Sequence, residues 1–101
     1  MNGTVHWTVP ADHPAFAGHF PDTPIFPGVM LLDTVIHTIT VATGIALDIC
    51  EIQSVKFLKP ASPGDDLLIR HILSTNGKIS FEILAGVKKI ASGIIVPKSP
   101  A

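Results

Sequence analysis

The alternation of apolar and polar residues along the chain predicts five strands around one helix. Val5, Trp7 and Val9 alternate with polar residues, which is the two-residue period of a half-buried strand. Four later apolar runs predict further strands, at residues 49–58, 66–74, 79–86 and 90–96. Asn76-Gly77 separates two of these runs and is a strong hairpin signal, so the strands should run antiparallel.

The stretch between Pro27 and Gly44 predicts a helix that is apolar on nearly all sides. Proline suits the first helical position because its missing N–H is not needed there, and glycine suits the C-terminal cap. The apolar residues of this stretch are Val29, Leu31, Leu32, Val35, Ile36, Ile39, Val41 and Ala42. We expect a central helix that protein surrounds, with an antiparallel sheet curled around it. This is the α+β hot-dog architecture.

The size and composition of the chain predict one domain and a subunit interface. The 101 residues are enough for a single domain, residues 1–101. Hydrophobic residues make up 47% and charged residues 15%, which is more apolar surface than one small core absorbs. We assign the surplus, together with the open strand edges, to the pairing of two protomers.

Charge, cysteine content and the first residues exclude several classes of protein. The formal net charge is −1 and the seven basic residues are scattered, which argues against a nucleic-acid partner. Cys50 is the single cysteine, so an intrachain disulfide and a two-cysteine redox or zinc motif are excluded. The first ten residues lack the basic and apolar regions of a signal peptide, and a cytoplasmic location fits best. Residues 29–47 resemble a membrane span, but Asp33 and His37 inside them favour a buried soluble helix.

Two residues near the start of the helix are candidates for chemistry. Residues 10–27 hold five of the nine prolines, which stiffen a long loop that carries His19. Asp33 interrupts the apolar helix, where a carboxylate must be paired, protonated or at the wall of a cavity. It could be a structural group satisfied by His37 one turn later, or a functional one. A loop histidine is by itself usually only solvated.

The free N–H groups of the first helical turn offer a third functional part. Gly28 is the least obstructed of these donors and could bind a carbonyl oxygen that acquires negative charge. Asp33 follows about 7.5 Å further along the helix axis. Dehydration of a 3-hydroxyacyl thioester needs a base for the C2 proton, a donor to the C1 oxygen and an acid for the C3 hydroxyl. A histidine suits the first task, and a carboxyl group in apolar surroundings suits the last.

The same residues resemble the signature of the 3-hydroxyacyl-acyl-carrier-protein dehydratases of fatty-acid synthesis. That signature reads His-Phe-Pro-Gly-x-Pro-(Ile/Val)-Met-Pro-Gly, with an acidic residue fourteen positions after the histidine. The chain has His19-Phe-Pro-Asp-Thr-Pro-Ile-Phe-Pro-Gly28, with Asp33 at the acidic position. Downstream, Val55-Lys-Phe-Leu-Lys-Pro60 and Pro63-Gly-Asp65 match the second recurring segment of the family. The resemblance extends from about Trp7 to Val96.

The resemblance implies a role for each matched residue. His19 would be the base, and Asp33 from the helix of the other subunit would be the acid. The amide of Gly28 would bind the thioester carbonyl, and the backbone carbonyl of Ile25 would orient the His19 ring. Phe20 is a candidate substrate contact, although a phenylalanine in such a loop more often packs in a core or interface.

The resemblance also implies what binds the protein. The substrate would be an acyl chain on the phosphopantetheine of acyl carrier protein. The assembly would be a homodimer or a larger assembly of dimers, and no metal or redox cofactor is expected. Lys56, Lys59, Lys88 and Lys89 could meet an acidic carrier protein, although charged strand edges are the default expectation.

Two positions depart from the family pattern, and three other functions remain open. Asp22 replaces a glycine, and His37 replaces a glutamine of the outer shell of the site, so His37 is a candidate for tuning Asp33. The alternatives are a thioesterase that uses Asp33 to activate water, a non-catalytic protein that binds an acyl carrier or a partner subunit, and a metal site. Such a metal site would combine Asp33 and His37 with His19 or His13. His6 and His71 are expected at solvated positions of the sheet.

Overall fold

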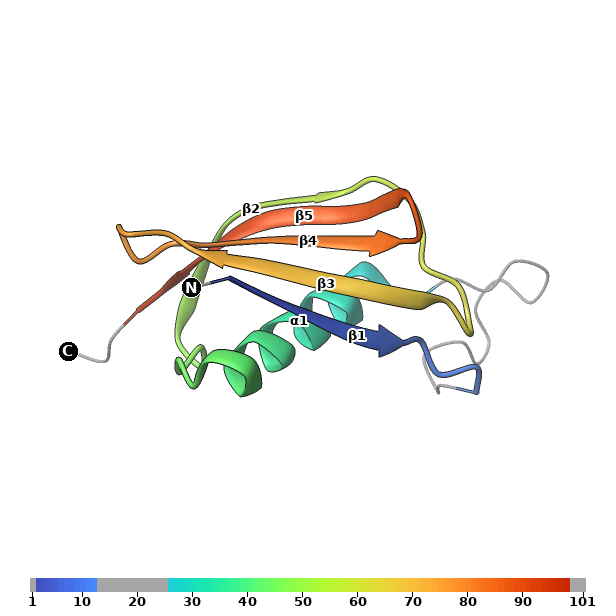
Figure 1. Ribbon diagram of the computed structural model, residues 1–101, viewed down its shortest axis with the longest axis horizontal. Coiled ribbons are helices and arrows are strands. Elements are labelled where there is room, and N and C mark those ends of the chain that lie inside the picture. The colour runs from blue at the N-terminus through green and yellow to red at the C-terminus, as the bar shows by residue number, and fades with distance from the viewer. Residues whose placement is uncertain (1, 13–25, 99–101) are drawn as a thin grey trace.

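The computed structural model describes residues 2–12 and 26–98, which form one helix against a five-stranded sheet (Figure 1). In chain order the elements are β1 (Asn2–Thr8), α1 (Gly28–Thr43), β2 (Cys50–Phe57), β3 (Asp66–Leu73), β4 (Ile79–Ala85) and β5 (Lys88–Pro97). The strands lie in the order β1-β3-β4-β5-β2, and every neighbouring pair is antiparallel. The predicted α+β arrangement of one helix and an antiparallel sheet is confirmed.

Glycine and proline set the ends of the elements where the sequence predicts them. Gly44 ends α1 in the left-handed conformation with φ 75°, and its N–H donates to the carbonyl of Thr40 at 2.9 Å. Pro27 is the N-cap of α1 rather than its first helical residue. The β3–β4 hairpin turns at Asn76-Gly77: the Gly77 N–H donates to the Ser74 carbonyl at 3.0 Å, and Gly77 has φ 85°, which glycine adopts without strain.

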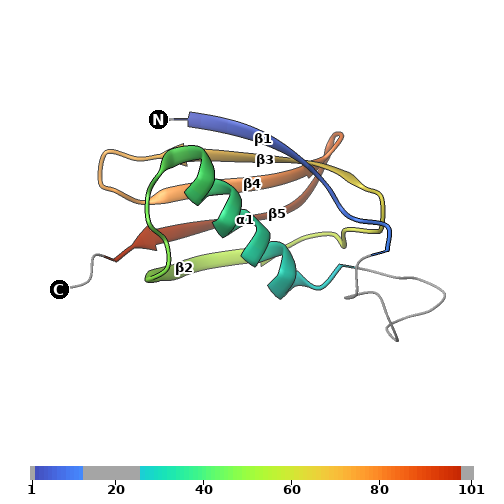
Figure 2. The ribbon, with the colours of Figure 1, turned by 90° about the horizontal axis from the view of Figure 1, so that it is seen from below.

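The helix crosses one face of the sheet diagonally and buries a single stripe of side chains against it (Figure 2). Leu31, Val35 and Ile39 form this stripe, at the four-residue spacing that keeps side chains on one face of a helix. They belong to one core with buried residues of the central strands: Leu67, Ile69, Ile79, Ile83 and Ile95. Each such buried side chain contributes about 1.5–3 kcal/mol to stability.

The side of α1 that faces away from the sheet is open in the single chain, which differs from the expectation of a helix surrounded by protein. Val29, Asp33, His37 and Val41 form this exposed stripe, again at four-residue spacing. Val29 is 73% exposed and Val41 is 72% exposed. The five-stranded sheet covers only one face of the helix, so residues 2–12 and 26–98 of one chain do not bury Asp33.

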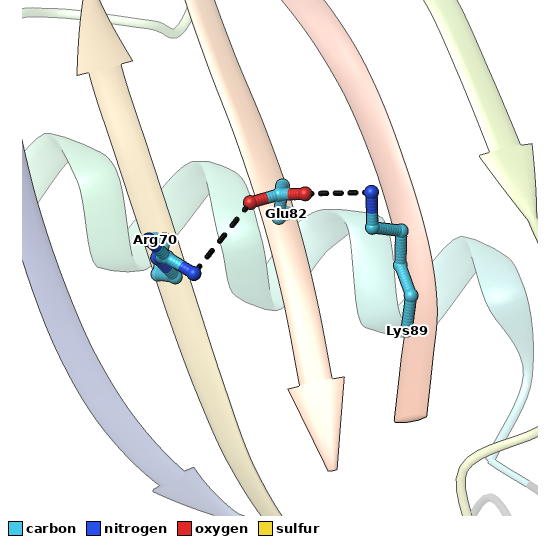
Figure 3. A network of polar contacts seen from close by, with 3 residues as sticks. All are labelled: Arg70, Glu82 and Lys89. Atoms are coloured by element: carbon cyan, nitrogen blue, oxygen red, sulfur yellow. Dashed lines mark ion pairs between the residues drawn. The ribbon is translucent and has the colours of Figure 1, made fainter. Parts of the chain in front are cut away.

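The outer face of the sheet carries an ion-pair network. Glu82 on β4 lies between Arg70 on β3 and Lys89 on β5, with the helix behind the strands (Figure 3). The Lys89 ammonium contacts the Glu82 carboxylate at 2.7 Å, and this hydrogen bond lowers the pKa of Glu82. All three side chains are more than one third exposed, so the network contributes little to stability.

His71 is buried, and the expectation that it is solvated is wrong. It follows Leu67 and Ile69 on the helix-facing side of β3 and is only 3% exposed. Gly3 is its register partner on β1, and a Cβ at Gly3 would collide with the Cε1 and Nε2 atoms of the imidazole, so the ring occupies space that glycine leaves open. The Nδ1 atom of His71 is buried and has no hydrogen-bond partner among the described residues.

Protonation of His71 should therefore destabilise the fold at mildly acidic pH. Burial lowers the pKa of His71 from its ordinary value of 6.5, so the unfolded chain takes up the proton at a higher pH than the folded chain. Between these two pKa values the unfolded state binds more protons, and stability falls as the pH is lowered through this range.

We predict that His71→Leu flattens this part of the pH profile, because leucine is apolar and cannot titrate. Urea unfolding of both proteins between pH 7.5 and pH 5 measures the effect, since every other titrating group is common to the two. An unchanged slope of stability against pH in the variant would contradict the assignment to His71.

Candidate active site

The structure describes three of the site residues predicted from the sequence. Gly28, Asp33 and His37 all lie on α1. The other predicted residues, His19, Phe20 and Ile25, lie outside the described residues, as do Asp22 and His13. The described part of the site therefore consists of the residues on α1 and the segments that pack against it.

Gly28 presents an open backbone donor at the start of the helix. The N–H groups of Met30 and Leu31 both donate to the carbonyl of Pro27, at 3.1 and 3.0 Å. The N–H of Gly28 has no acceptor among residues 2–12 and 26–98, as expected for a first-turn amide. This amide can therefore donate to a ligand oxygen.

The ring of Phe57 packs closely over Gly28. A Cβ on Gly28 would lie 3.0 to 3.2 Å from three atoms of the Phe57 ring, closer than most real Cβ contacts. Phe57 is nevertheless 50% exposed, so its ring covers Gly28 on one side and borders open space on the other. A Cβ at residue 28 would require the ring to shift by a few tenths of an ångström.

The open space beside Phe57 is a largely apolar groove of about 330 Å³, which we call the Gly28 groove. Its lining residues are Phe26, Gly28, Leu31, Phe57, Leu58, Lys59, Pro60 and Ala61. Backbone hydrogen bonds fix the far wall: Leu58 and Lys59 both donate to the carbonyl of Ile90, at 2.8 and 3.2 Å. Phe26 donates to Ala61 at 2.7 Å and ties this wall to the segment before the helix.

Asp33 lines a different groove, of about 320 Å³, which we call the Asp33 groove. It is formed by Asp33, Ile36, His37, Thr40, Leu47 and Asp48. Asp33 and His37 lie one helical turn apart, and no ion pair joins them in the described part of the chain.

Among residues 2–12 and 26–98, no three potential metal ligands cluster. The described helix is also too short to cross a bilayer.

Within one chain, Gly28 and Asp33 do not converge on one substrate. They are five residues apart, which at about 100° per residue rotates Asp33 by about 140° around the helix relative to Gly28. Their separate grooves agree with this rotation. From the sequence, the axial distance of about 7.5 Å suggested that Gly28 and Asp33 act on one substrate. That distance takes no account of their rotation around the helix.

Sequence reasoning missed the part that Phe57 and its neighbours play in the site. The second recurring segment, residues 55–60, forms the wall of the Gly28 groove through Phe57, Leu58, Lys59 and Pro60. This segment is far from Gly28 in the sequence, so the sequence does not indicate that the two are in contact. The match to the family segment Val-Lys-Phe-x-x-Pro marked Phe57 as part of a recurring motif, but it did not indicate which residue Phe57 packs against.

Solved structures with the same arrangement establish the hot-dog fold. The dehydratase heterocomplex ApeI:P from Xenorhabdus doucetiae matches with a TM-score of 0.77 and 26% identity, over 94% of this chain and 85% of that one. The fluoroacetyl-CoA thioesterase FlK matches with a TM-score of 0.67 over 94% of this chain and 83% of its own. Its 19% identity supports the fold alone.

Sequence comparison gives the family. The ApeI-like family, described as ApeI dehydratase, matches residues 2–94, and the chain belongs to this family. The 3-hydroxyacyl-[acyl-carrier-protein] dehydratase FabZ of Chlamydia muridarum is 33% identical over 98 residues, which cover 84% of this chain. FabZ of Paramagnetospirillum magneticum is 29% identical over 100 residues. The chain spans 64% and 61% of the length of these two relatives.

Proposed function

We propose that the protein removes water from a 3-hydroxyacyl thioester to give a trans-2-enoyl thioester. The observation that carries this proposal is the amide of Gly28, which has no acceptor among the described residues, lines an apolar groove and stands where the family motif ends. A preorganised backbone donor of this kind stabilises an oxygen that gains negative charge during reaction. Membership of the dehydratase family supports the same reaction.

Each bond change of the reaction has a proposed group. His19 takes the C2 proton while the thioester oxygen accepts a hydrogen bond from Gly28. The electron pair then forms the C2–C3 double bond as the C3–O bond breaks. Asp33 gives its proton to the departing hydroxyl, which leaves as water. His37, one turn from Asp33 in the same groove, is proposed to tune that carboxyl group.

The active unit is proposed to be a dimer in which Asp33 of one chain serves the Gly28 groove of the other. The rotation of about 140° between the two residues separates them within a chain. Asp33 lies on the exposed stripe of α1 between Val29 and Val41, whose apolar side chains a partner would bury. A partner that covers the stripe would also remove Asp33 from water, which suits a general acid.

We propose that the acyl group arrives on the phosphopantetheine of acyl carrier protein, in the cytoplasm. The names of the FabZ relatives specify acyl chains on that carrier. The single cysteine, Cys50, is compatible with a reducing compartment.

Loss of either catalytic group should abolish most of the activity. We predict that His19→Ala and Asp33→Asn each lower the rate of hydration of a trans-2-enoyl thioester by about 10²- to 10⁴-fold, the usual contribution of general acid–base catalysis. Asp66→Asn is the matched control, because it makes the same chemical change at an exposed strand position on β3. Wild-type rates in either catalytic variant would exclude that residue from the reaction.

The products distinguish dehydration from the alternatives. Incubation of the protein with 3-hydroxyacyl and acyl thioesters, followed by mass spectrometry, separates enoyl product from free thiol. Enoyl product supports the dehydratase, and free thiol without enoyl product would make the protein a thioesterase. Unchanged substrate would favour a non-catalytic acyl-binding protein.

The exposed stripe of α1 should form the dimer contact. We predict that Val41→Glu shifts the protein from dimer to monomer. The proposed interface would bury the new carboxylate without a partner, which costs several kcal/mol. Sedimentation velocity measures the shift, and circular dichroism checks that the variant is folded. Val87→Glu is the control, because Val87 is 98% exposed between β4 and β5. A Val41→Glu protein that remains fully dimeric would place the interface elsewhere.

A further inference from the structure

The stretch of chain between Val9 and Phe26 carries His19, and we call it the His19 segment. Val9 follows β1 directly, and Phe26 stands two residues before α1. Val9 is fully buried; its N–H donates to the Asp65 carbonyl at 2.9 Å, and its carbonyl accepts the Gly64 N–H at 2.8 Å. Two hydrogen bonds therefore tie the start of the His19 segment to the connection between β2 and β3.

The end of the His19 segment is tied to the same connection. Phe26 forms an antiparallel bridge with Ala61, and its N–H donates to the Ala61 carbonyl at 2.7 Å. Both residues are buried, and both line the Gly28 groove. The rings of Trp7 and Phe26 also pack together, with their centroids 5.6 Å apart. Figures 1 and 2 show the end of β1, the start of α1 and the β2–β3 connection at one end of the molecule.

A tight turn of residues 62–65 fixes the distance between the two attachment points, Ala61 and Asp65. The Asp65 N–H donates to the Ser62 carbonyl at 3.1 Å, and Gly64 has φ 81°. Proline at the second position and a glycine of positive φ at the third are typical of a type II turn. The Asp65 side chain closes the turn a second time, because its Oδ2 atom accepts the Ser62 N–H at 2.8 Å.

Asp65 thus stands where one residue affects both ends of the His19 segment. Its carbonyl binds Val9, and its carboxylate stabilises the turn that begins next to Ala61, the partner of Phe26. Gly28, the proposed oxyanion donor, follows Phe26 by two residues, so the same attachment also bears on its amide. A catalytic base and an oxyanion donor act only in the correct geometry, and a misplacement of about 1 Å can cost about 10²-fold in rate.

We propose that Asp65 is a positioning residue, whose turn holds both ends of the His19 segment in place for the reaction. The effect on the reaction rests on the proposed function, whereas the attachment itself stands on the hydrogen bonds of Val9, Phe26 and Ser62. Asp65 acts as a hydrogen-bond acceptor and needs no contact with the substrate. An asparagine, whose amide oxygen accepts the same hydrogen bond, should therefore replace it.

Hydrogen exchange of single amides, measured by NMR, tests the attachment without catalysis. We expect Asp65→Ala to speed exchange of the Val9 and Phe26 amide protons about two- to tenfold, as the loss of one hydrogen bond implies. Asp65→Asn should leave both rates at the wild-type level. Asn76→Ala is the matched control, because the Asn76 Oδ1 atom accepts the Lys78 N–H at 3.1 Å in the turn at the opposite end of β3. It should leave both amides unchanged.

Kinetics then separate positioning from stability, with circular dichroism as the check that each variant is folded. Asp65→Ala should lower kcat for hydration of a trans-2-enoyl thioester about 10- to 100-fold and leave KM nearly unchanged. Asp65→Asn should retain the wild-type kcat. In a His19→Ala background, Asp65→Ala should lower the residual rate far less, because residues that act as a unit are not additive. Should Asp65→Ala not fold, Asp65→Glu, which moves the acceptor by one methylene, replaces it with the same expected loss of kcat.

The outcomes separate this inference from the proposed function. Unchanged exchange at Val9 and Phe26 in Asp65→Ala, or a wild-type kcat in that variant, would overturn the positioning role. An Asp65→Asn protein as impaired as Asp65→Ala, or an equal loss of rate with and without His19, would overturn it as well. Faster exchange at both amides that asparagine restores, without turnover of any thioester by the wild-type protein, would support the attachment and refute the dehydratase.

Discussion

The structure depends on the packing of an apolar helix against a sheet that covers only one of its faces. Leu31, Val35 and Ile39 fill that contact, while Val29 and Val41 on the opposite side remain mostly exposed. Each such side chain left in water forgoes about 1.5–3 kcal/mol of burial. A second copy of the chain is the cover we propose, and Asp33 in the middle of the exposed stripe then becomes an interface residue.

The geometry of the helix links that cover to catalysis. Gly28 faces the groove beneath Phe57, and Asp33 faces another groove about 140° around the axis. Because both residues are fixed on one rigid helix, changes of side-chain rotamer do not remove this rotation between Gly28 and Asp33. The proposed dimer joins the two grooves from different chains without bending the helix, so under the proposed function activity requires assembly.

The sequence predicted the elements well because their ends depend on local chemistry. Pro27 restricts the backbone, whereas Gly44 and Gly77 adopt the positive φ that other residues avoid, and the structure bounds α1 and the β3–β4 hairpin at these residues. The exposure of Asp33 could not be predicted, because an apolar pattern does not tell whether the same chain or another covers it. His71 was predictable from its alternation with Leu67 and Ile69, but its polarity hid that pattern.

Mixing two inactive variants tests the shared site most directly. His19→Ala and Asp33→Asn proteins are unfolded together in equal amounts and refolded, and the hydration of an enoyl thioester is measured. If each site takes His19 from one chain and Asp33 from the other, random pairing makes half of the dimers mixed, each with one intact site. The account therefore predicts recovery of about a quarter of wild-type activity. Activity that stays at the level of the separate variants would contradict it.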